Sequence, residues 1–320
     1  MRTTTTTQRA VQEYLDDRRR LGFDLRISGL LLLHFARYAD ARGHRGPLTL
    51  ELQLEWARTQ AHRATPITWA RRLEILRPFA RYYRQDEPNT AVPDLTTFGR
   101  AHRRLTPHIY TEQELADLLE AAARLRPSGG LRPATYEALF GVIAATGLRL
   151  SEALQLRDAD VDLRSGALTV RETKCKKSRL LPLHPSTVDA LGRYQRRRDH
   201  AVPRTEGMPF FVARTGHALP KPTVHGIFVA LRTRLGWVAR GGHPHPRIHD
   251  LRHTFAVRRV QHWQRSGVTM DHGMFLLCTY LGHATIAATY WYLTGTPELL
   301  ATIGTRFERF ACPAGEVAHA

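Results

Sequence analysis

Two tyrosines, Tyr290 and Tyr292, lie close behind the tripeptide Leu281-Gly282-His283 near the end of this sequence. A tyrosine hydroxyl has an ordinary pKa of about 10, so it is a weak nucleophile at neutral pH. It attacks only when the target is polarised, the leaving group is protonated and fixed cations hold the developing charge. A nucleophilic tyrosine therefore predicts arginines, a lysine and histidines in separate motifs upstream.

Two upstream motifs supply arginines of the kind required. Arg149 lies in a predicted helix–helix turn, where a guanidinium can bind two phosphate oxygens at once, and Glu152 three residues later can orient it. His249 and Arg252 are spaced to lie on one face of a predicted helix, from which both can donate to the non-bridging oxygens of one phosphate. Each spacing alone also fits an ordinary surface pair, so the order of the motifs carries the interpretation.

The lysines are confined to few positions. The chain has only four, and three of them are Lys174, Lys176 and Lys177. They fall in a predicted turn between two stretches of period two, 167–171 and 179–183, which indicate a β-hairpin. Lys174 is the first candidate for the acid that protonates a leaving group. Lys176 and Lys177 remain open as alternatives because a hairpin turn leaves the register loose.

Composition points to a polyanionic partner. Lysine plus arginine outnumber the acids 47 to 29, which gives a net charge of +18 and a pI near 10.7. Such a field attracts nucleic acid, the usual polyanion. No segment approaches the roughly 18 apolar residues that a membrane helix needs. Three scattered cysteines suit a reducing compartment, and the N-terminus shows no apolar signal core, so we expect a cytoplasmic, DNA-associated protein.

Periodicity divides the chain into two domains. Residues 1–85 predict a bundle of four helices with 16 arginines, no lysine and 8 acids, which suits DNA binding or, alternatively, a solvated domain without a partner. Residues 86–107 contain three prolines and predict a linker. Residues 108–320 predict a mixed domain of helices and one small hairpin. The fold class is therefore mainly α with a small β-sheet: an all-α N-terminal bundle and an α+β second domain.

Local signals set the predicted helices of the second domain. A capping box at Thr111 and Glu114 opens a helix to about residue 124, and a second helix, 133–146, ends at Gly147. Ser151 is the expected N-cap of a short helix over 152–156, and Phe210 to Val212 form a strand or an extended segment. Further helices are expected at 185–198, 221–236, 249–265, 269–281, 284–293 and 296–309.

A run of histidines, His243, His245, His249 and His253, raises the question of a metal. No cysteine or acidic residue with ligand spacing accompanies them. The sequence therefore predicts no metal site.

Taken together, these motifs resemble the tyrosine recombinase (phage integrase) family over residues of about 107 to 300. The family's first arginine box resembles 145–156, its hairpin box 173–183, its His-x-x-Arg box 249–252 and its Leu-Gly-His box 281–283. In this family the nucleophile follows the last box by nine residues. The resemblance thus selects Tyr292, because two tyrosines two residues apart point about 200° from each other on a helix.

The resemblance implies a role for each candidate. Tyr292 attacks the scissile phosphate and forms a 3′-phosphotyrosyl link, while a 5′-hydroxyl leaves. No ATP, nicotinamide or metal is implied, because the bonds broken and remade are both phosphodiesters. Arg149 and Arg252 are implied to clamp the phosphate, and Lys174 is implied to protonate the leaving oxygen. The implied role of His249 and His283 is to hydrogen-bond the phosphate or to assist proton removal from Tyr292.

The resemblance also implies the partners. The N-terminal bundle resembles the family's core-binding domain, which with the catalytic domain clamps duplex DNA, and strand exchange between paired sites implies a homo- or hetero-tetramer of protomers. An integrase or transposase of a mobile element in a bacterial cytoplasm is the expected type. The alternatives are a Xer-type dimer resolvase, a type IB topoisomerase and a catalytically silent architectural DNA-binding protein.

Overall fold

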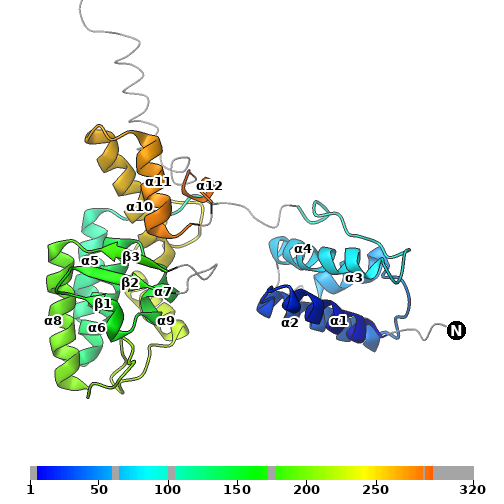
Figure 1. The fold of residues 1–320 in the computed structure, drawn as a ribbon, viewed down its shortest axis with the longest axis horizontal. Coiled ribbons are helices and arrows are strands. Elements are labelled where there is room, and N and C mark those ends of the chain that lie inside the picture. Colours follow the sequence, from blue (N-terminus) through cyan, green and yellow to red (C-terminus); the bar gives the residue numbers. More distant parts are fainter. Residues whose placement is uncertain (1–5, 60–64, 100–104, 172–177, 284, 291–320) are drawn as a thin grey trace, which may run out of the picture. The chain divides into compact units, whose positions relative to one another are not determined.

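The computed structural model describes residues 6–59, 65–99, 105–171, 178–283 and 285–290. The chain divides into two compact units, Met1–Arg104 and Leu105–Ala320 (Figure 1). The described residues are mostly helical, and their one sheet is small and lies in the second unit. The fold class expected from the sequence is thus confirmed.

The N-terminal unit packs its helices around aromatic side chains. Trp56 is fully buried, with its ring centroid 5.2 Å from that of Phe35, and Tyr14 lies edge-on to Phe79. Burying rings of this size contributes much of the stability of a small bundle. The predicted helices are present, as α1 Thr7–Arg20, α2 Arg26–Ala41, α3 Leu50–Arg58 and α4 Pro66–Tyr83.

The segment after α4 stays with this unit. The Ala91 N–H donates to the Leu48 carbonyl over 2.8 Å, and the buried Gln53 side chain donates to the Ala91 carbonyl over 2.8 Å. Phe98 packs on Trp69, with ring centroids 5.6 Å apart. Much of the stretch that the sequence assigns to a linker therefore lies against the helices that precede it.

The second unit begins with a sequence of helices and a three-stranded sheet. The sheet is antiparallel in the order β1-β2-β3, and the register places Val170 opposite Arg179 and Leu168 opposite Leu181. The sequence predicted β2 and β3 but missed the two-residue β1. The elements are α5 Glu112–Ala123, α6 Leu131–Thr146, α7 Leu150–Gln155, a 3-10 turn Asp158–Asp160, β1 Val161–Asp162, β2 Ala167–Val170, β3 Arg179–Pro182 and α8 Pro185–Ala201.

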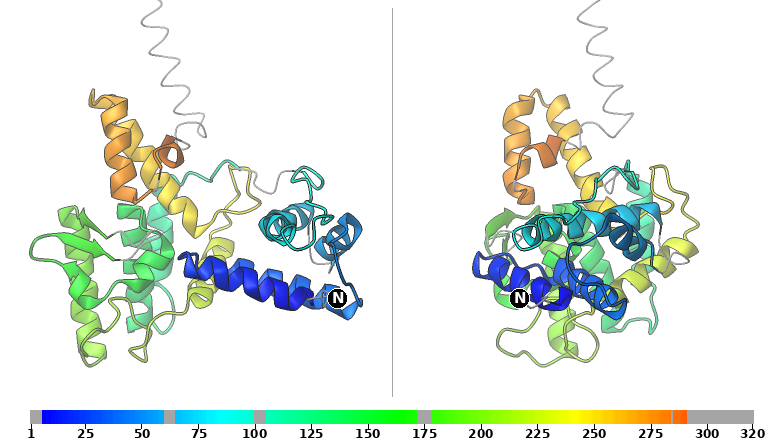
Figure 2. Two further views of the ribbon diagram at one scale, coloured as in Figure 1. Left: turned by 45° about the vertical axis from the view of Figure 1, so that its right-hand side comes forward. Right: turned by 90° about the vertical axis from the view of Figure 1, so that its right-hand side faces the viewer.

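Four further helices complete the described part of this unit: α9 Lys221–Arg234, α10 Ile248–Arg265, α11 Met270–Leu281 and α12 Ala287–Tyr290. Helices α5, α6 and α8 pack together beside the sheet, and α10 packs on both α6 and α11 (Figures 1 and 2). Phe210 to Val212 are buried, but Phe210 and Phe211 lie in a bend and Val212 forms only an isolated bridge with Ala218, so the predicted strand or extended segment is not formed. No helix among the residues just described is long and apolar enough to cross a membrane.

Helix ends in the second unit follow local chemistry. The Thr111 hydroxyl accepts from the Glu114 N–H while the Glu114 carboxylate accepts from the Thr111 N–H, as the predicted capping box requires. The expectation that Ser151 caps the next helix is wrong. Helix α7 begins at Leu150, with Arg149 as its N-cap residue, because the Glu152 carboxylate accepts the Arg149 N–H over 3.0 Å.

Gly147 ends α6 in the left-handed conformation, with φ of 66°. A Cβ there would lie 2.6 Å from the Phe255 ring and 3.1 Å from Leu281. We expect Gly147→Ala to destabilise the unit by about 2–4 kcal/mol, because left-handed strain adds to overpacking. Gly207→Ala is the control, since Gly207 has φ of 70° but no atom within 4 Å of its Cβ position. Denaturant unfolding of both variants measures the difference, and equal losses would contradict the steric argument.

Candidate active site

Arg252 is buried at the centre of the predicted site and is 1% exposed. Its Nη1 donates to the Gly147 carbonyl over 2.7 Å, and its Nη2 donates to the Leu281 carbonyl over 2.8 Å. Those two carbonyls belong to the glycine turn before Arg149 and to the Leu-Gly-His turn. Three motifs, of which the first lies 105 residues before Arg252 and the last 29 residues after it, therefore meet at one guanidinium.

Glu152 lies beside this arginine and is buried. Its Oε1 accepts from Arg149 Nη1 over 2.6 Å, and its Oε2 lies 4.0 Å from Arg252 Nη1. Burial alone would raise the pKa of the Glu152 carboxyl, but hydrogen bonds from Arg179 and from the Arg149 N–H hold it below its ordinary value. Glu152 is therefore an anion that orients the cations around it.

Arg179, the first residue of β3, is a member of this cluster that the sequence analysis missed. Its Nη2 donates to Glu152 Oε2 over 2.9 Å, and its Nε donates to the Tyr280 carbonyl over 2.8 Å. A signal was present in the sequence. Side chains two apart on a strand share a face, so Arg179 lies on the face of the buried Leu181, and a charge on a buried face requires a partner.

His283 contacts both the arginine cluster and the tyrosine segment. Its Nε2 lies 3.0 Å from Arg252 Nη2, which can only donate, so Nε2 is the acceptor. The neutral ring therefore carries its proton on Nδ1, which donates to the hydroxyl of the buried Thr289 over 2.7 Å. Burial, followed by the charge of Arg252, lowers the pKa of His283 to about 4. The ring is thus neutral at pH 7 and links Arg252 to Thr289, the residue before Tyr290.

His249 lies in the first turn of α10, with its ring exposed at the surface. Crowding by protein atoms and then the charges of Arg252 and Arg247 lower its pKa. The ring of His253 lies against it, with centroids 4.7 Å apart. His249 is thus the accessible histidine of the site, whereas His253 is buried behind it.

The Tyr290 side chain bonds to a residue outside the arginine cluster. Tyr290, in α12, donates its hydroxyl to Asp271 over 3.0 Å. That contact ties α12 to the first turn of α11 rather than to the arginines. Tyr292 and Lys174 lie outside the described residues.

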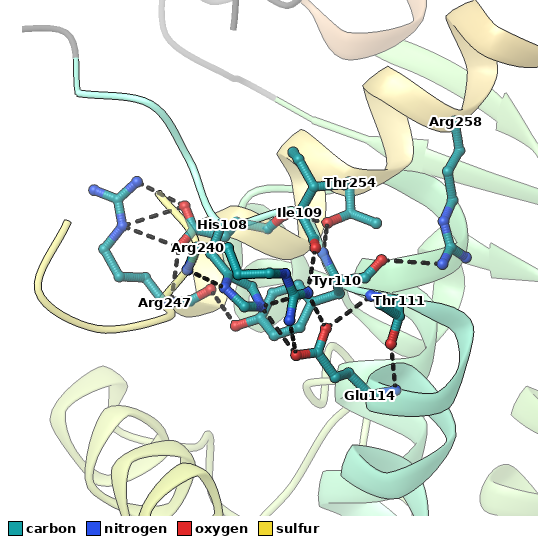
Figure 3. A network of polar contacts seen from close by, with 10 residues as sticks. His108, Ile109, Tyr110, Thr111, Glu114, Arg240, Arg247, Thr254 and Arg258 are labelled. Carbon is teal, nitrogen blue, oxygen red and sulfur yellow. Dashed lines mark hydrogen bonds and ion pairs between the residues drawn. The ribbon is translucent and has the colours of Figure 1, made fainter. Parts of the chain in front are cut away.

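A polar network holds the start of α10 in place (Figure 3). Tyr110 donates its backbone N–H to Thr254 over 2.9 Å and its hydroxyl to the Arg247 carbonyl over 3.0 Å. Arg240 bonds to Glu114 and to the Ile109 carbonyl, which joins α5 to the loop before α10. The helix that carries His249 and Arg252 is thus anchored at its N-terminal end by the segment that begins the unit.

The described part of the chain contains no group of three or more His, Cys, Asp or Glu side chains that could hold a metal. What the cluster offers instead is concentrated positive charge. Guanidiniums from three elements lie around one carboxylate, and the neutral His283 accepts from one of them. Such an arrangement can bind a tetrahedral dianion or the charge that develops during phosphoryl transfer.

The model of the phage integrase family matches residues 109–298, which include every one of these motifs. The chain belongs to the phage integrase family. It is a tyrosine site-specific recombinase by this match and by its relatives. A putative integrase/recombinase of Sinorhizobium fredii, y4rB, is 39% identical over 308 residues, which are 95% of this chain and 98% of the relative. The tyrosine recombinase XerD of Neisseria meningitidis is 31% identical over 192 residues, 58% of each protein.

Solved structures show the same fold. The integrase of transposon Tn1549, in complex with transposon right-end DNA, superposes with a TM-score of 0.68 at 18% identity and covers 95% of this recombinase and 99% of that chain. The XerH site-specific recombinase, in a post-cleavage complex with its palindromic difH substrate, gives a TM-score of 0.64 at 20% identity, with 88% and 78% covered.

The lowered histidine pKa values predict an acid sensitivity of this recombinase. Between pH 6.5 and about 4 the unfolded chain binds a proton at His283 that the folded chain does not. Stability is therefore full above pH 6.5 and declines as the pH falls toward 4. Denaturant unfolding at pH 7, 5.5 and 4.5 should show a smaller decline for His283→Gln than for the unmodified chain. Parallel declines would contradict the assignment to His283.

Proposed function

We propose that this recombinase cleaves and rejoins DNA through a 3′-phosphotyrosyl intermediate on Tyr292. The observation that supports this most directly is the convergence of Arg149, Arg252 and His283 around the buried Glu152. The family places a nucleophilic tyrosine just after the Leu-Gly-His motif. Thr289, bonded to His283, lies three residues before Tyr292.

The cleavage step balances without any cofactor. The Tyr292 oxygen forms a bond to phosphorus as the bond to the 5′ oxygen breaks. The departing 5′ oxygen takes a proton from Lys174, and the phenolic proton passes to His249 or to solvent. Arg149 and Arg252 hold the non-bridging oxygens, where charge gathers in the transition state. Attack by a 5′-hydroxyl on the phosphotyrosine reverses these steps and joins a strand.

His283 acts by accepting from Arg252 in this scheme. A neutral ring with its proton on Nδ1 leaves Nε2 as an acceptor for the guanidinium. Arg252 is thereby fixed by two carbonyls and one imidazole before DNA binds. An arginine that is already in place loses less entropy when the phosphate arrives, which is the basis of electrostatic preorganisation.

Duplex DNA with paired recombination sites is the proposed partner. The charge of +18 favours the phosphate backbone, and the N-terminal unit is the proposed core-binding domain, with residues 108–320 as the catalytic domain. Exchange between two duplexes requires four active sites, so a tetramer of protomers in the bacterial cytoplasm is proposed. Contacts with the backbone position the protein, and base edges or DNA bending supply the sequence specificity.

A mobile element is the proposed setting. A relative that covers nearly all of this chain is a putative integrase/recombinase, and a transposon integrase shares the fold. A Xer-type dimer resolvase is the second candidate, because tyrosine recombinases XerD are among the relatives. The two differ in their DNA substrate. A resolvase recombines two sites within a chromosome or plasmid dimer, and an integrase joins the ends of an element to a target site.

The test uses a suicide duplex that is nicked beside the cleavage point and spans the candidate element end. Cleavage releases a short fragment, so the covalent adduct accumulates and survives denaturation. Peptide mass mapping then identifies the residue that carries the nucleotide, which we expect to be Tyr292. Relaxation of supercoiled DNA without any paired site, by a monomer, would favour a topoisomerase instead. Binding without adduct or relaxation would indicate an architectural protein.

A further inference from the structure

Arg179 has no role in the chemistry proposed above, although it is hydrogen-bonded to the buried Glu152 of the site. Its side chain is 11% exposed and makes three hydrogen bonds to two partners. Two of them form a fork onto the Glu152 carboxylate, at 3.3 and 2.9 Å, and the third goes to the Tyr280 carbonyl. It thus connects β3 with α7 and with the end of α11.

The Glu152 carboxylate is fully occupied in this arrangement. Oε1 accepts from Arg149 Nη1 and Arg179 Nη1, and Oε2 accepts from the Arg149 backbone N–H and Arg179 Nη2. A carboxylate offers about four lone-pair sites, so none is left over. Arg252, at 4.0 Å, lies just beyond hydrogen-bond distance and is directed at carbonyls instead.

The charges show what Arg179 adds. Three guanidiniums against one carboxylate give the cluster a net charge of +2, and without Arg179 that charge would be +1. Without Arg179 the carboxylate would lose two of its four donors and would attract Arg149 and Arg252 more strongly. Both cations would be drawn toward Glu152 and away from an incoming phosphate, because a buried carboxylate interacts strongly at low dielectric.

Gly282 shows that the structure makes room for this side chain. A Cβ at Gly282 would lie 2.7 Å from Arg179 Nη1, and the residue has φ of 64°. The guanidinium therefore lies directly on the turn that carries His283. Only a glycine satisfies both the left-handed backbone and the close approach of the arginine.

We propose that Arg179 is a positioning residue of the cleavage reaction. It neutralises the Glu152 carboxylate, so that Arg149 stays directed at the scissile phosphate. This inference rests on the proposed function, because it assigns Arg179 a part in the same phosphoryl transfer. It acts through Arg149 and makes no contact with DNA. The consequence is a specific dependence on the negative charge of the phosphate.

The experiment compares two suicide duplexes, one with a normal scissile phosphate and one with a methylphosphonate, in which a methyl group replaces a charged oxygen. Single-turnover adduct formation is measured per folded molecule. We expect Arg179→Gln to slow cleavage of the phosphodiester about 10- to 100-fold, the range for a misplaced catalytic group. On the methylphosphonate, which has less charge to hold, the loss should be less than about threefold, since the clamp matters less.

Arg198→Gln is the matched control. Arg198, on α8, is also buried, at 0% exposure, and donates to Asp158 and to the Phe210 carbonyl. Its loss should destabilise the unit and slow the two substrates by the same factor. Arg179→Lys is the second variant if Arg179→Gln does not fold, because it keeps the charge but cannot make all three hydrogen bonds. It should show a smaller loss with the same preference for the neutral substrate.

Two results would overturn the proposal. Equal losses on both duplexes would assign Arg179 a structural role only. The second is a cleavage defect of Arg179→Gln that disappears when sulfur replaces the 5′ leaving oxygen. Sulfur departs without a proton, so that result would show that Arg179 acts on the proton donor, Lys174, rather than on Arg149. Failure of the proposed function itself is distinguishable, because the unmodified protein would then form no adduct on any duplex.

Discussion

Replacing Tyr292 by phenylalanine should reduce the covalent protein–DNA adduct to background while DNA binding persists. Phenylalanine keeps the ring and removes the only oxygen able to form the bond to phosphorus. Arg149, Arg252 and His283 would remain, so the phosphate would still be held. The suicide duplex, resolved under denaturing conditions, measures the adduct, and a gel shift at fixed salt measures binding.

The matched control is Tyr290→Phe, which removes the same atom two residues earlier. The Tyr290 hydroxyl donates to Asp271 in a hydrogen bond that is exposed to solvent, so its loss should disturb α12 only slightly. We expect adduct formation within about threefold of the unmodified protein, since a small change in helix anchoring shifts rates modestly. An adduct that survives Tyr292→Phe and vanishes in Tyr290→Phe would reassign the nucleophile.

The second large effect is expected for Arg252→Ala, which should slow cleavage by about 10²–10³-fold or more, as for loss of a preorganised donor to a developing anion. The substitution also leaves the Gly147 and Leu281 carbonyls without this donor. Each uncompensated buried group costs about 1–3 kcal/mol, so the rate must be normalised to the folded fraction. Arg252→Lys should fail as well, because the three donors of one ammonium cannot serve both carbonyls, His283 and a phosphate.

Arg259→Ala serves as the control on the same helix. Arg259 lies 5.6 Å over the Phe255 ring and makes no contact with the cluster around Glu152 that the structure records. Its cleavage rate should stay within about threefold, because an exposed cation–π contact contributes only about 0.5–1 kcal/mol. Cleavage by Arg252→Ala at the rate of the Arg259 variant would remove Arg252 from the proposed chemistry.

The sequence predicted the helices and the hairpin well because local signals set them. A capping box at Thr111, a glycine at 147 and period-two alternation around Leu168 all act within a few residues. The prediction that Ser151 caps α7 was wrong because a second local signal competes with it. Serine is a common N-cap residue, but the carboxylate of Glu152 accepts the Arg149 N–H and stabilises an earlier start of the helix. The strand Val161–Asp162 was missed because two residues carry no periodicity.

For the site, the sequence supplied the motifs but not their partners. Order and spacing indicated Arg149, His249, Arg252 and His283, and the structure brings these motifs to one cluster. The contact of Arg179 with Glu152 joins residues 27 apart across two elements, and no local pattern encodes it. The proton position on His283 likewise depends on Arg252, which lies 31 residues earlier.

The anchoring of the segment 105–111 has a mechanical consequence. Thr106 accepts from the Gly242 N–H over 2.9 Å, and Tyr110 is pinned through its N–H, its carbonyl and its hydroxyl. A force applied to the chain at Thr106 would therefore act on these bonds before it reached α10, and Figure 3 shows those of Tyr110 with Thr254, Arg247 and Arg258. The start of the second unit is thus fastened by its own hydrogen bonds to α10, the helix that carries His249 and Arg252.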